Sequence, residues 1–188
     1  DRVIVTPAPG RTARLPFWHG DGSGRDCGFG TAEGAFIRQV CTGLTDAAEA
    51  GHPRFDTATA DRLHDDGLDD NAVENLARLL AEQRKATGVV PDDRRMVIER
   101  CPDDEGDWRV IIHSRYGRRV HEPWAMAITA RLKQRYGFDG QAYAADDGIV
   151  LRLPAQEHDI DVPELIRFDP DDMQRMIETQ VGETVLFA

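Results

Sequence analysis

The chain has 188 residues and a formal net charge of −11 at pH 7, with 40% hydrophobic and 30% charged residues. This length allows a sizeable core in one or two domains, whereas no stretch approaches the roughly 20 apolar residues of a membrane-spanning helix. The acidic total excludes a surface that binds nucleic acid throughout, but not one local basic track. Three widely spaced cysteines fit neither a disulfide framework nor a zinc site and favour a reducing, intracellular compartment.

The first 56 residues are expected to contain one helix between two irregular regions. Residues 3–5 resemble the end of a strand, and residues 7–30 are rich in Pro and Gly, which predicts mostly loop. Thr31 is placed to cap a helix. Its apolar positions are Phe36, Ile37, Val40 and Leu44. Residues 45–56 are polar and are expected to be irregular.

Two more helices are predicted before the composition changes. Residues 57–66 favour a short helix and residues 70–87 a longer one. In the longer helix the apolar residues recur at helical spacing and are Val73, Leu76, Ala77 and Leu80. Asp69 or Asp70 is placed to cap this helix, and Gly88 to end it.

The second half predicts two hairpins separated by a helix. Strands are expected at 95–101 and 108–113 around a turn, and at 141–145 and 148–153 around an Asp-Asp-Gly turn. The intervening helix is expected from Pro123, which suits a first helical turn, to Tyr136. Its apolar stripe is Trp124, Ile128, Leu132 and Tyr136, and Trp108 and Trp124 are interpreted as core residues.

The tail predicts two helices, near 162–167 and at 170–180. The order is a helical first half, a central β-β-α-β-β unit and a helical tail, which is an α+β fold. We expect a single domain, residues 1–188, with possible sub-parts 1–90 and 91–188. Because the chain opens almost inside a strand and ends in an apolar run, we interpret it as a piece of a longer protein.

The segment from Trp108 to Tyr136 is the most informative feature for function. It contains seven Arg or Lys and one acid, Glu122, so its formal charge is +6 inside a chain of −11. An apolar strand, an Arg-rich turn and a helix are expected to direct Arg115, Arg118 and Arg119 to one place, and the cations of the following helix extend the positive field. Guanidinium groups bind phosphates, and an aromatic ring can stack on a base. The predicted contacts here are His113, Arg115, Tyr116, Arg118, Arg119, Arg131, Lys133 and Arg135. The alternative is that each cation pairs with one of the many carboxylates.

Trp18 is a second candidate contact. It lies in a Gly-rich loop near several cations, where a Trp either anchors the loop to the core or offers its ring to a base. The residues alone favour anchoring by Phe17 or Trp18. The two neighbours can also divide these roles, with Phe17 inward and Trp18 outward.

No catalytic site and no metal site are predicted. Residues 20–24 are Gly-rich but lack the Lys-Ser/Thr ending of a phosphate-binding P-loop. His64 and the neighbouring aspartates at 65, 66, 69 and 70 offer metal-like ligands, but a polar helix connection usually carries such residues as solvated caps. A stand-alone hydrolase that uses this cluster is the less favoured enzyme hypothesis.

Several motifs together resemble a known family. Residues 113–125, His-Ser-Arg-Tyr-Gly-Arg-Arg-Val-His-Glu-Pro-Trp-Ala, and residues 145–154, Ala-Asp-Asp-Gly-Ile-Val-Leu-Arg-Leu-Pro, are similar to the DEAD/H-associated domain after the helicase core of large helicase-related (Lhr-type) superfamily 2 helicases. The opening at 2–10, Leu-Pro-Phe-Trp at 15–18 and the end at 178–188 resemble the same region. The resemblance therefore covers nearly the whole chain.

The resemblance implies an accessory domain of an ATP-dependent helicase that moves 3′ to 5′ on single-stranded DNA and unwinds duplexes in DNA repair. ATP and Mg²⁺ would belong to ATPase modules that, with a winged-helix module, precede residue 1, and no cofactor is expected in the chain itself. The implied partners are single-stranded DNA or an RNA:DNA hybrid and these modules, in a cytoplasmic, nucleoid-associated protein and without a membrane.

In the family a Trp of this domain stacks on a base, and motif position assigns that role to Trp18. Related proteins more often have Pro where Arg115 stands, which leaves open whether Arg115 is a shared contact. The alternative from another class is a protein-interaction module that docks on the ATPase modules or another partner without touching DNA.

Overall fold

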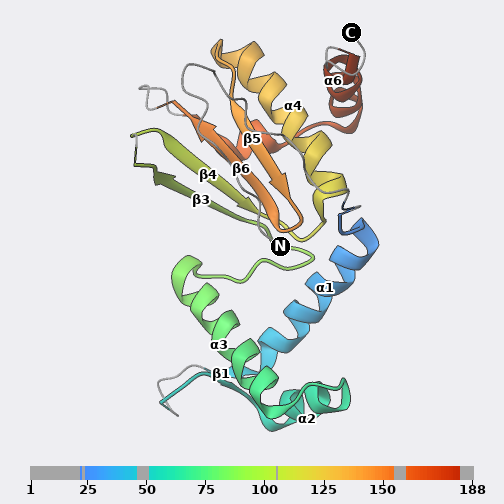
Figure 1. The fold of residues 1–188 in the computed structure, drawn as a ribbon, viewed down its shortest axis with the longest axis vertical. Coiled ribbons are helices and arrows are strands. Elements are labelled where there is room, and N and C mark those ends of the chain that lie inside the picture. The colour runs from blue at the N-terminus through green and yellow to red at the C-terminus, as the bar shows by residue number, and fades with distance from the viewer. Residues whose placement is uncertain (1–21, 23, 46–50, 105, 155–159, 183–188) are drawn as a thin grey trace, which may run out of the picture.

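The computed structural model describes residue 22 and residues 24–45, 51–104, 106–154 and 160–182. These residues form a helical part and a sheet part, joined end to end in an elongated molecule (Figure 1). Each part has its own hydrophobic core. The predicted α+β class and its order of helical start, central sheet and helical tail are confirmed.

Three helices and a two-stranded ladder form the helical part. The elements are α1 (Cys27–Val40), a 3₁₀ turn (Cys41–Gly43), β1 (Leu44–Thr45), β2 (Arg54–Phe55), α2 (Thr57–Asp65) and α3 (Asp70–Thr87). The side chain of Asp69 caps α3 by accepting the amide of Ala72, and Gly88 ends it in the left-handed conformation, as predicted. The short β1–β2 ladder is not predicted, because the sequence places Leu44 in the preceding helix and residues 45–56 in irregular chain.

Helix α1 begins four residues before the predicted start at Thr31. The carboxylate of Asp26 accepts the amide of Phe29 at 2.8 Å and so supplies the cap. Thr31 lies inside the helix, where its hydroxyl donates to the Cys27 carbonyl oxygen. The predicted start is late because the glycines at 28 and 30 favour a loop, whereas both lie within the helix.

The sheet part is a four-stranded antiparallel sheet with the order β3-β4-β6-β5. Its strands are β3 (Val97–Pro102), β4 (Trp108–His113), β5 (Gln141–Ala145) and β6 (Gly148–Leu153). Helix α4 (Arg118–Tyr136) covers one face, where its residues Ile128 and Leu132 are fully buried against Val110, Ile112 and Leu151. Both predicted hairpins are confirmed, and their alternating apolar residues account for the buried face.

Helix α4 begins at Arg118, five residues before the predicted start at Pro123. The predicted Arg-rich turn is therefore partly the first turn of the helix itself. This extra turn is held because His121 is fully buried and because the amides of Val120 and His121 donate to the Gly117 carbonyl. Pro123, which removes one backbone donor, is tolerated early in the helix.

The tail consists of α5 (Val162–Ile166) and α6 (Pro170–Gly182), close to the predicted ranges. The indole nitrogen of Trp124 donates to the Ile166 carbonyl oxygen at 2.9 Å, which ties α5 to α4. Trp108 and Trp124 are partly buried and pack against the core, as the sequence predicts. Within the described part of the chain, no helix combines the length and apolar character needed to cross a membrane.

The two parts meet along one face of α1. A Cβ at position 30 would lie 1.9 Å from the carbonyl oxygen of Arg115, so only glycine allows this approach. The other main contact is a two-pronged ion pair, in which Arg38 Nε and Nη2 donate to the Asp93 carboxylate at 2.7 and 3.1 Å. This pairing holds the pKa of Asp93 below its usual range.

Gly30→Ala tests the close packing between α1 and the sheet part. The added methyl group forces α1 away from the Arg115 carbonyl, so we expect a loss of about 1–3 kcal/mol in the free energy of unfolding. Gly182→Ala, where a Cβ meets nothing within 4 Å, is the matched control and should change stability by less than about 1 kcal/mol. Equal urea-unfolding midpoints for the two variants would contradict this account.

Candidate nucleic-acid interface

The predicted cationic turn lies where β4 ends and α4 begins. Gly117 is the N-cap of α4 and has a φ of 89°, and it offers no side-chain hydrogen bond to the helix. A Cβ there would lie 2.2 Å from the carbonyl oxygen of Arg25, so the chain that leads into α1 crosses directly against this turn. Three segments therefore meet here: residues 24–26, the β4–α4 turn and the β5–β6 turn.

Asp146 in the β5–β6 turn joins these three segments. Its Oδ1 accepts the backbone amide of Arg25 at 2.7 Å and that of Arg118 at 2.9 Å. It thus caps α4 from a distant part of the sequence and satisfies a helix amide that the cap residue leaves unpaired. The amide of Arg118, followed by that of Arg25, stabilises the carboxylate and lowers the pKa of Asp146.

Arg115 and Tyr116 face the helical part of the protein. The guanidinium of Arg115 donates to Glu33 Oε1 at 2.9 Å and to the Pro91 carbonyl oxygen at 3.2 Å, and its side chain is only 23% exposed. The Tyr116 hydroxyl donates to the Asp93 carbonyl oxygen at 3.2 Å. Both predicted contact residues therefore hold the two parts together.

Arg25 completes a charged network at the same place. Its Nη1 lies 3.0 Å from Glu33 Oε2 and 2.9 Å from Asp147 Oδ1, so each Glu33 oxygen has one arginine within ion-pair distance. A cleft of about 320 Å³ is lined by these residues together with His113. Because the cleft contains two arginines and two carboxylates, it holds no large excess of positive charge.

The remaining cations of the turn are more accessible. The Arg118 side chain is 36% exposed, and its guanidinium donates to the Gly22 carbonyl oxygen and pairs with Glu122 at 3.1 Å. Arg119, the next residue of the helix, is exposed. His113 lies on the sheet face opposite α4, with Nε2 3.3 Å from Glu99.

The other predicted cations lie at the far end of α4. Arg131 donates to the carbonyl oxygens of Glu164, Leu165 and Arg167 at the end of α5 and stacks over the Phe168 ring at 3.4 Å. Burial lowers the pKa of Arg131 from its ordinary value. Lys133 pairs with Asp139 at 3.0 Å, and Arg135 with Glu164 at 2.8 Å, a contact that raises the pKa of Arg135.

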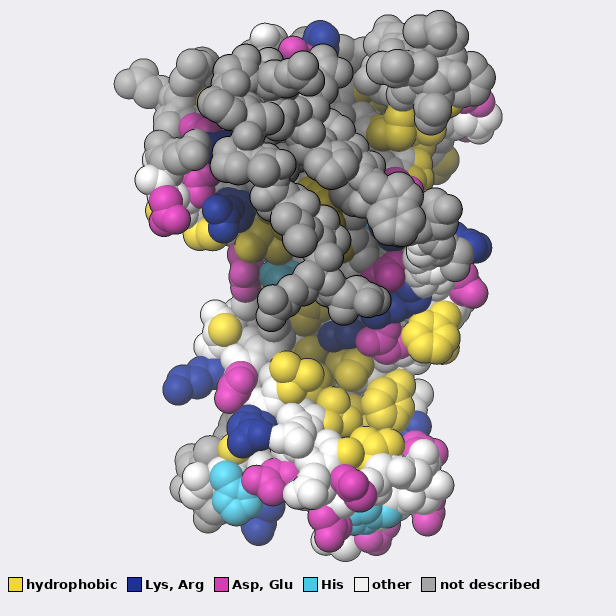
Figure 2. Space-filling model, viewed as in Figure 1, with side chains coloured by type: hydrophobic (Ala, Val, Ile, Leu, Met, Phe, Trp, Pro, Cys, Tyr) yellow, Lys and Arg dark blue, Asp and Glu magenta, His cyan; other side chains and the backbone are white. Residues whose placement is uncertain are grey.

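The structure divides the predicted basic track into two clusters. Thirteen helical residues separate positions 118 and 131, which corresponds to roughly 20 Å along the axis. Arg115, Arg118 and Arg119 lie at the β4–α4 turn, and Arg131, Lys133 and Arg135 lie further along α4, which is the arrangement expected from the sequence. Figure 2 also shows Lys and Arg side chains beside Asp and Glu side chains where the two parts meet.

A buried Ser-His pair lies under the turn and is structural. His121 Nδ1 lies 2.6 Å from the Ala145 carbonyl oxygen and its Nε2 lies 2.9 Å from Ser114 Oγ, and both side chains are at most 2% exposed. Burial lowers the pKa of His121, so the neutral ring donates through Nδ1 and accepts from the serine hydroxyl. The pair resembles a nucleophile with its base, but both residues are almost fully buried.

The aspartate-rich connection near His64 forms no metal site. His64 Nε2 lies 3.1 Å from Asp70 Oδ1, and both side chains are open to solvent. Among the residues that the structure describes, no three His, Cys, Asp or Glu side chains are placed to hold a metal ion. This arrangement fits the solvated caps predicted from the sequence.

The sequence analysis does not predict which acidic residues pair with the basic segment. Asp146 and Asp147 are predicted only as turn residues, and neither Glu33 nor Arg25 is linked there to the basic segment. Contacts between residues about 80 to 120 positions apart leave no local pattern. Trp18 and the predicted strand at 3–5 lie outside the described residues. The role of each predicted contact in nucleic-acid binding remains a prediction.

Comparison with known proteins identifies the family. The model of the DEAD/H associated family matches residues 90–188, which is more than half of the chain. The chain belongs to this family. It is also 43% identical over all 188 residues to the Lhr helicase/uracil glycosylase of Escherichia coli K12, and 47% identical to the Lhr helicase/probable uracil glycosylase of Mycolicibacterium smegmatis.

A solved structure gives the same assignment. The helicase Lhr of Mycobacterium smegmatis, in a structure bound to ssDNA and AMP-PNP, matches with a TM-score of 0.75 and 43% identity over 95% of this chain. The chain covers 21% of that protein and spans 11% and 12% of the two curated relatives. It is thus an accessory domain of an Lhr-type helicase.

Asp146→Asn tests the role of the shared carboxylate. Asn keeps an oxygen that accepts hydrogen bonds but loses the charge, so we expect the melting temperature at pH 7 to fall by roughly 2–5 °C. Because the folded-state pKa of Asp146 is lowered, its contribution is present at neutral pH and is lost as the pH falls through that lowered pKa. The difference between the variant and the parent should therefore shrink in acid, as thermal unfolding at several pH values would show.

Asp147→Asn is the control for this prediction. The Asp147 side chain is 77% exposed, and its ion pair with Arg25 is open to solvent and screened by salt, so we expect the melting temperature to change by less than about 1 °C. An equal loss in both variants would refute the special role of Asp146.

Proposed function

We propose that this domain contacts the single-stranded DNA along which its parent helicase moves 3′ to 5′, and that it helps to guide the strand during unwinding. The observation that carries the proposal is the similarity to a helicase Lhr solved with ssDNA, at 43% identity over 95% of the chain. At this identity a shared surface is a reasonable basis for a shared ligand. The contacts themselves are expected to be largely independent of base sequence.

The candidate DNA contacts can be ranked by how deeply the ion pair of each residue is buried. Arg118, Lys133 and Arg135 each form an ion pair that solvent reaches, and Arg118 also donates to the Gly22 carbonyl oxygen. Exposed ion pairs contribute little to stability, so a phosphate can replace the carboxylate at little cost. Arg115 and Arg131 each hold two or more protein groups in partly buried positions. The exposed cations, with Arg119, are therefore the better candidates for contacts with phosphates.

The parent protein would supply the chemistry. ATP and Mg²⁺ would bind to ATPase modules elsewhere in the longer chain, and a winged-helix module would complete the path of the strand. Single-stranded DNA or the displaced strand of an RNA:DNA hybrid would be the substrate, with a role in DNA repair. The domain itself would carry out no chemical step.

A second function is supported by the paired charges at the junction. Both arginines that line the described cleft between the two parts face carboxylates, which leaves little free positive charge there for a phosphate backbone. A module that docks on the ATPase modules without touching DNA would fit this balance. DNA binding by variants of the parent protein distinguishes the two functions.

The Arg118→Gln and Arg119→Gln double variant of the full-length parent tests the DNA contact. Glutamine removes the charge without setting a new acid beside Glu122, so the helix should remain intact. We expect weaker binding to single-stranded DNA. The slope of the logarithm of the binding constant against the logarithm of the salt concentration should fall in magnitude by roughly one for each phosphate that the variant no longer neutralises. Arg78→Gln, on exposed helix α3, is the control and should leave the slope unchanged. If the double variant binds as the parent does at every salt concentration, these two residues do not contact DNA.

Trp18→Ala tests the stacking role that the family resemblance assigns to this residue. Loss of one stacked base should weaken binding by about 1–3 kcal/mol and slow translocation of the parent helicase. The melting temperature should change little. A large drop in melting temperature would instead assign Trp18 to the core.

A further inference from the structure

Strand β5 presents an open edge. In the sheet order it pairs with β6 on one side and with no described strand on the other. Its sequence, Gln-Ala-Tyr-Ala-Ala, contains neither a charge nor a proline, and four of its five residues are exposed. Proteins usually protect a free edge with charged residues, prolines or bulges, because unpaired backbone groups accept another strand. An edge without any of these devices is suited to a strand partner.

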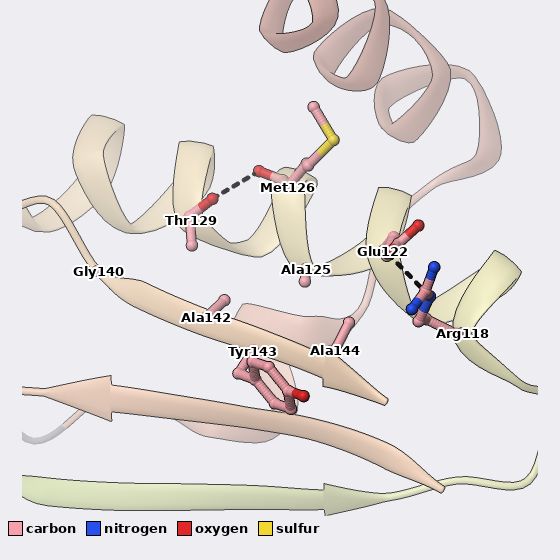
Figure 3. A pocket seen from close by; sticks show the side chains of 9 residues that line it. All are labelled: Arg118, Glu122, Ala125, Met126, Thr129, Gly140, Ala142, Tyr143 and Ala144. Atoms are coloured by element: carbon pink, nitrogen blue, oxygen red, sulfur yellow. Dashed lines mark hydrogen bonds and ion pairs between the residues drawn. The ribbon is translucent and has the colours of Figure 1, made fainter. Parts of the chain in front are cut away.

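A groove runs beside this edge, between β5 and α4 (Figure 3). It has a volume of about 630 Å³. Ala142 and Ala144 point toward α4, where Ala125, Met126 and Thr129 line the opposite wall, whereas Tyr143 points away from the helix. The Arg118–Glu122 pair lies at one end. Small side chains on both walls leave room for the side chains of an added strand.

We propose that β5 pairs with an extended segment of the parent helicase that lies outside residues 1–188. Backbone hydrogen bonds would join that segment to the open edge, and every second side chain would enter the groove, because side chains alternate between the two faces of a strand. This interface goes beyond the proposed DNA contact and does not depend on it.

The occupant follows from the chemistry of the site and from the size of the relatives. A row of backbone amides and carbonyls is complementary to another polypeptide backbone. This chain spans 11–12% of the two curated Lhr relatives, so segments of the same polypeptide would be the partner at the highest effective concentration. The groove is lined by small apolar side chains in its middle and by the Arg118–Glu122 pair at one end, so the predicted partner strand places apolar side chains against Ala125, Ala142 and Ala144.

Photo-cross-linking in the full-length parent tests the proposal directly. Tyr143 is 64% exposed at the centre of the edge, and Tyr143→p-benzoylphenylalanine places a photoreactive ring there. We expect an intramolecular cross-link to a peptide outside residues 1–188, both with and without single-stranded DNA. A cross-link to DNA, to a second copy, to residues within 1–188, or no cross-link at all would overturn the proposal.

Hydrogen exchange of residues 141–145 in the full-length parent gives a second, independent test. If the edge is paired, the amides in this range that do not bond to β6 should also exchange slowly in the parent protein. Ala142→Lys places a charge in the groove and should speed their exchange about tenfold or more, because an inward-facing charge prevents strand addition.

Gln141→Lys is the matched control for this variant, because residue 141 lies on the other face of the same strand. It should leave the exchange slow. Rapid exchange in the unmodified parent would refute the paired edge, whatever the DNA-binding variants show. The two proposals therefore fail separately.

Discussion

One carboxylate, that of Asp146, determines how the parts of this domain meet. It accepts the amides of Arg25 and Arg118 on the same oxygen and so fixes the start of α4, the approach to α1 and the β5–β6 turn together. Gly117 allows the backbones to cross at this point, and Gly30 brings α1 against the same turn. These backbone hydrogen bonds position the segments that carry Arg25 and Arg115, which then pair with Glu33. Without this acceptor the first turn of α4 would lose its cap.

The cations of the basic segment have two kinds of role. Arg115 and Arg131 each satisfy several carbonyl or carboxylate oxygens and belong to the architecture. Arg118, Lys133 and Arg135 form exposed ion pairs, which salt or a competing anion opens easily. A charge count along the chain treats these residues alike, whereas the burial of their ion pairs separates them. The exposed cations are therefore the residues whose contacts with DNA can be tested by substitution.

Local patterns predict most of the fold, and long-range contacts explain the failures. The alternating apolar residues of β4 and β6, the helical spacing in α3 and the Asp-Asp-Gly turn determine their elements correctly, because each signal lies within a few residues. The predicted starts of α1 and α4 are four and five residues late, since glycines favour a loop and Pro123 favours a helix start. The cap that holds the first turn of α4 comes from Asp146, 28 positions further along the chain, and no sequence window contains both. The acidic partners of the basic segment are not predicted for the same reason, because they too lie far away in the sequence.

Arg131 has a consequence for how the domain moves. Its guanidinium binds three carbonyl oxygens at the end of α5 and covers the Phe168 ring, so the chain that leads into α6 is anchored to α4. A guanidinium keeps its proton at any physiological pH, so this anchor does not release with acidity. Whatever follows α6 in a longer protein therefore starts from a fixed point and in a fixed direction relative to the sheet. Such a connection transmits a displacement of the sheet part to α6 without the slack of a flexible linker.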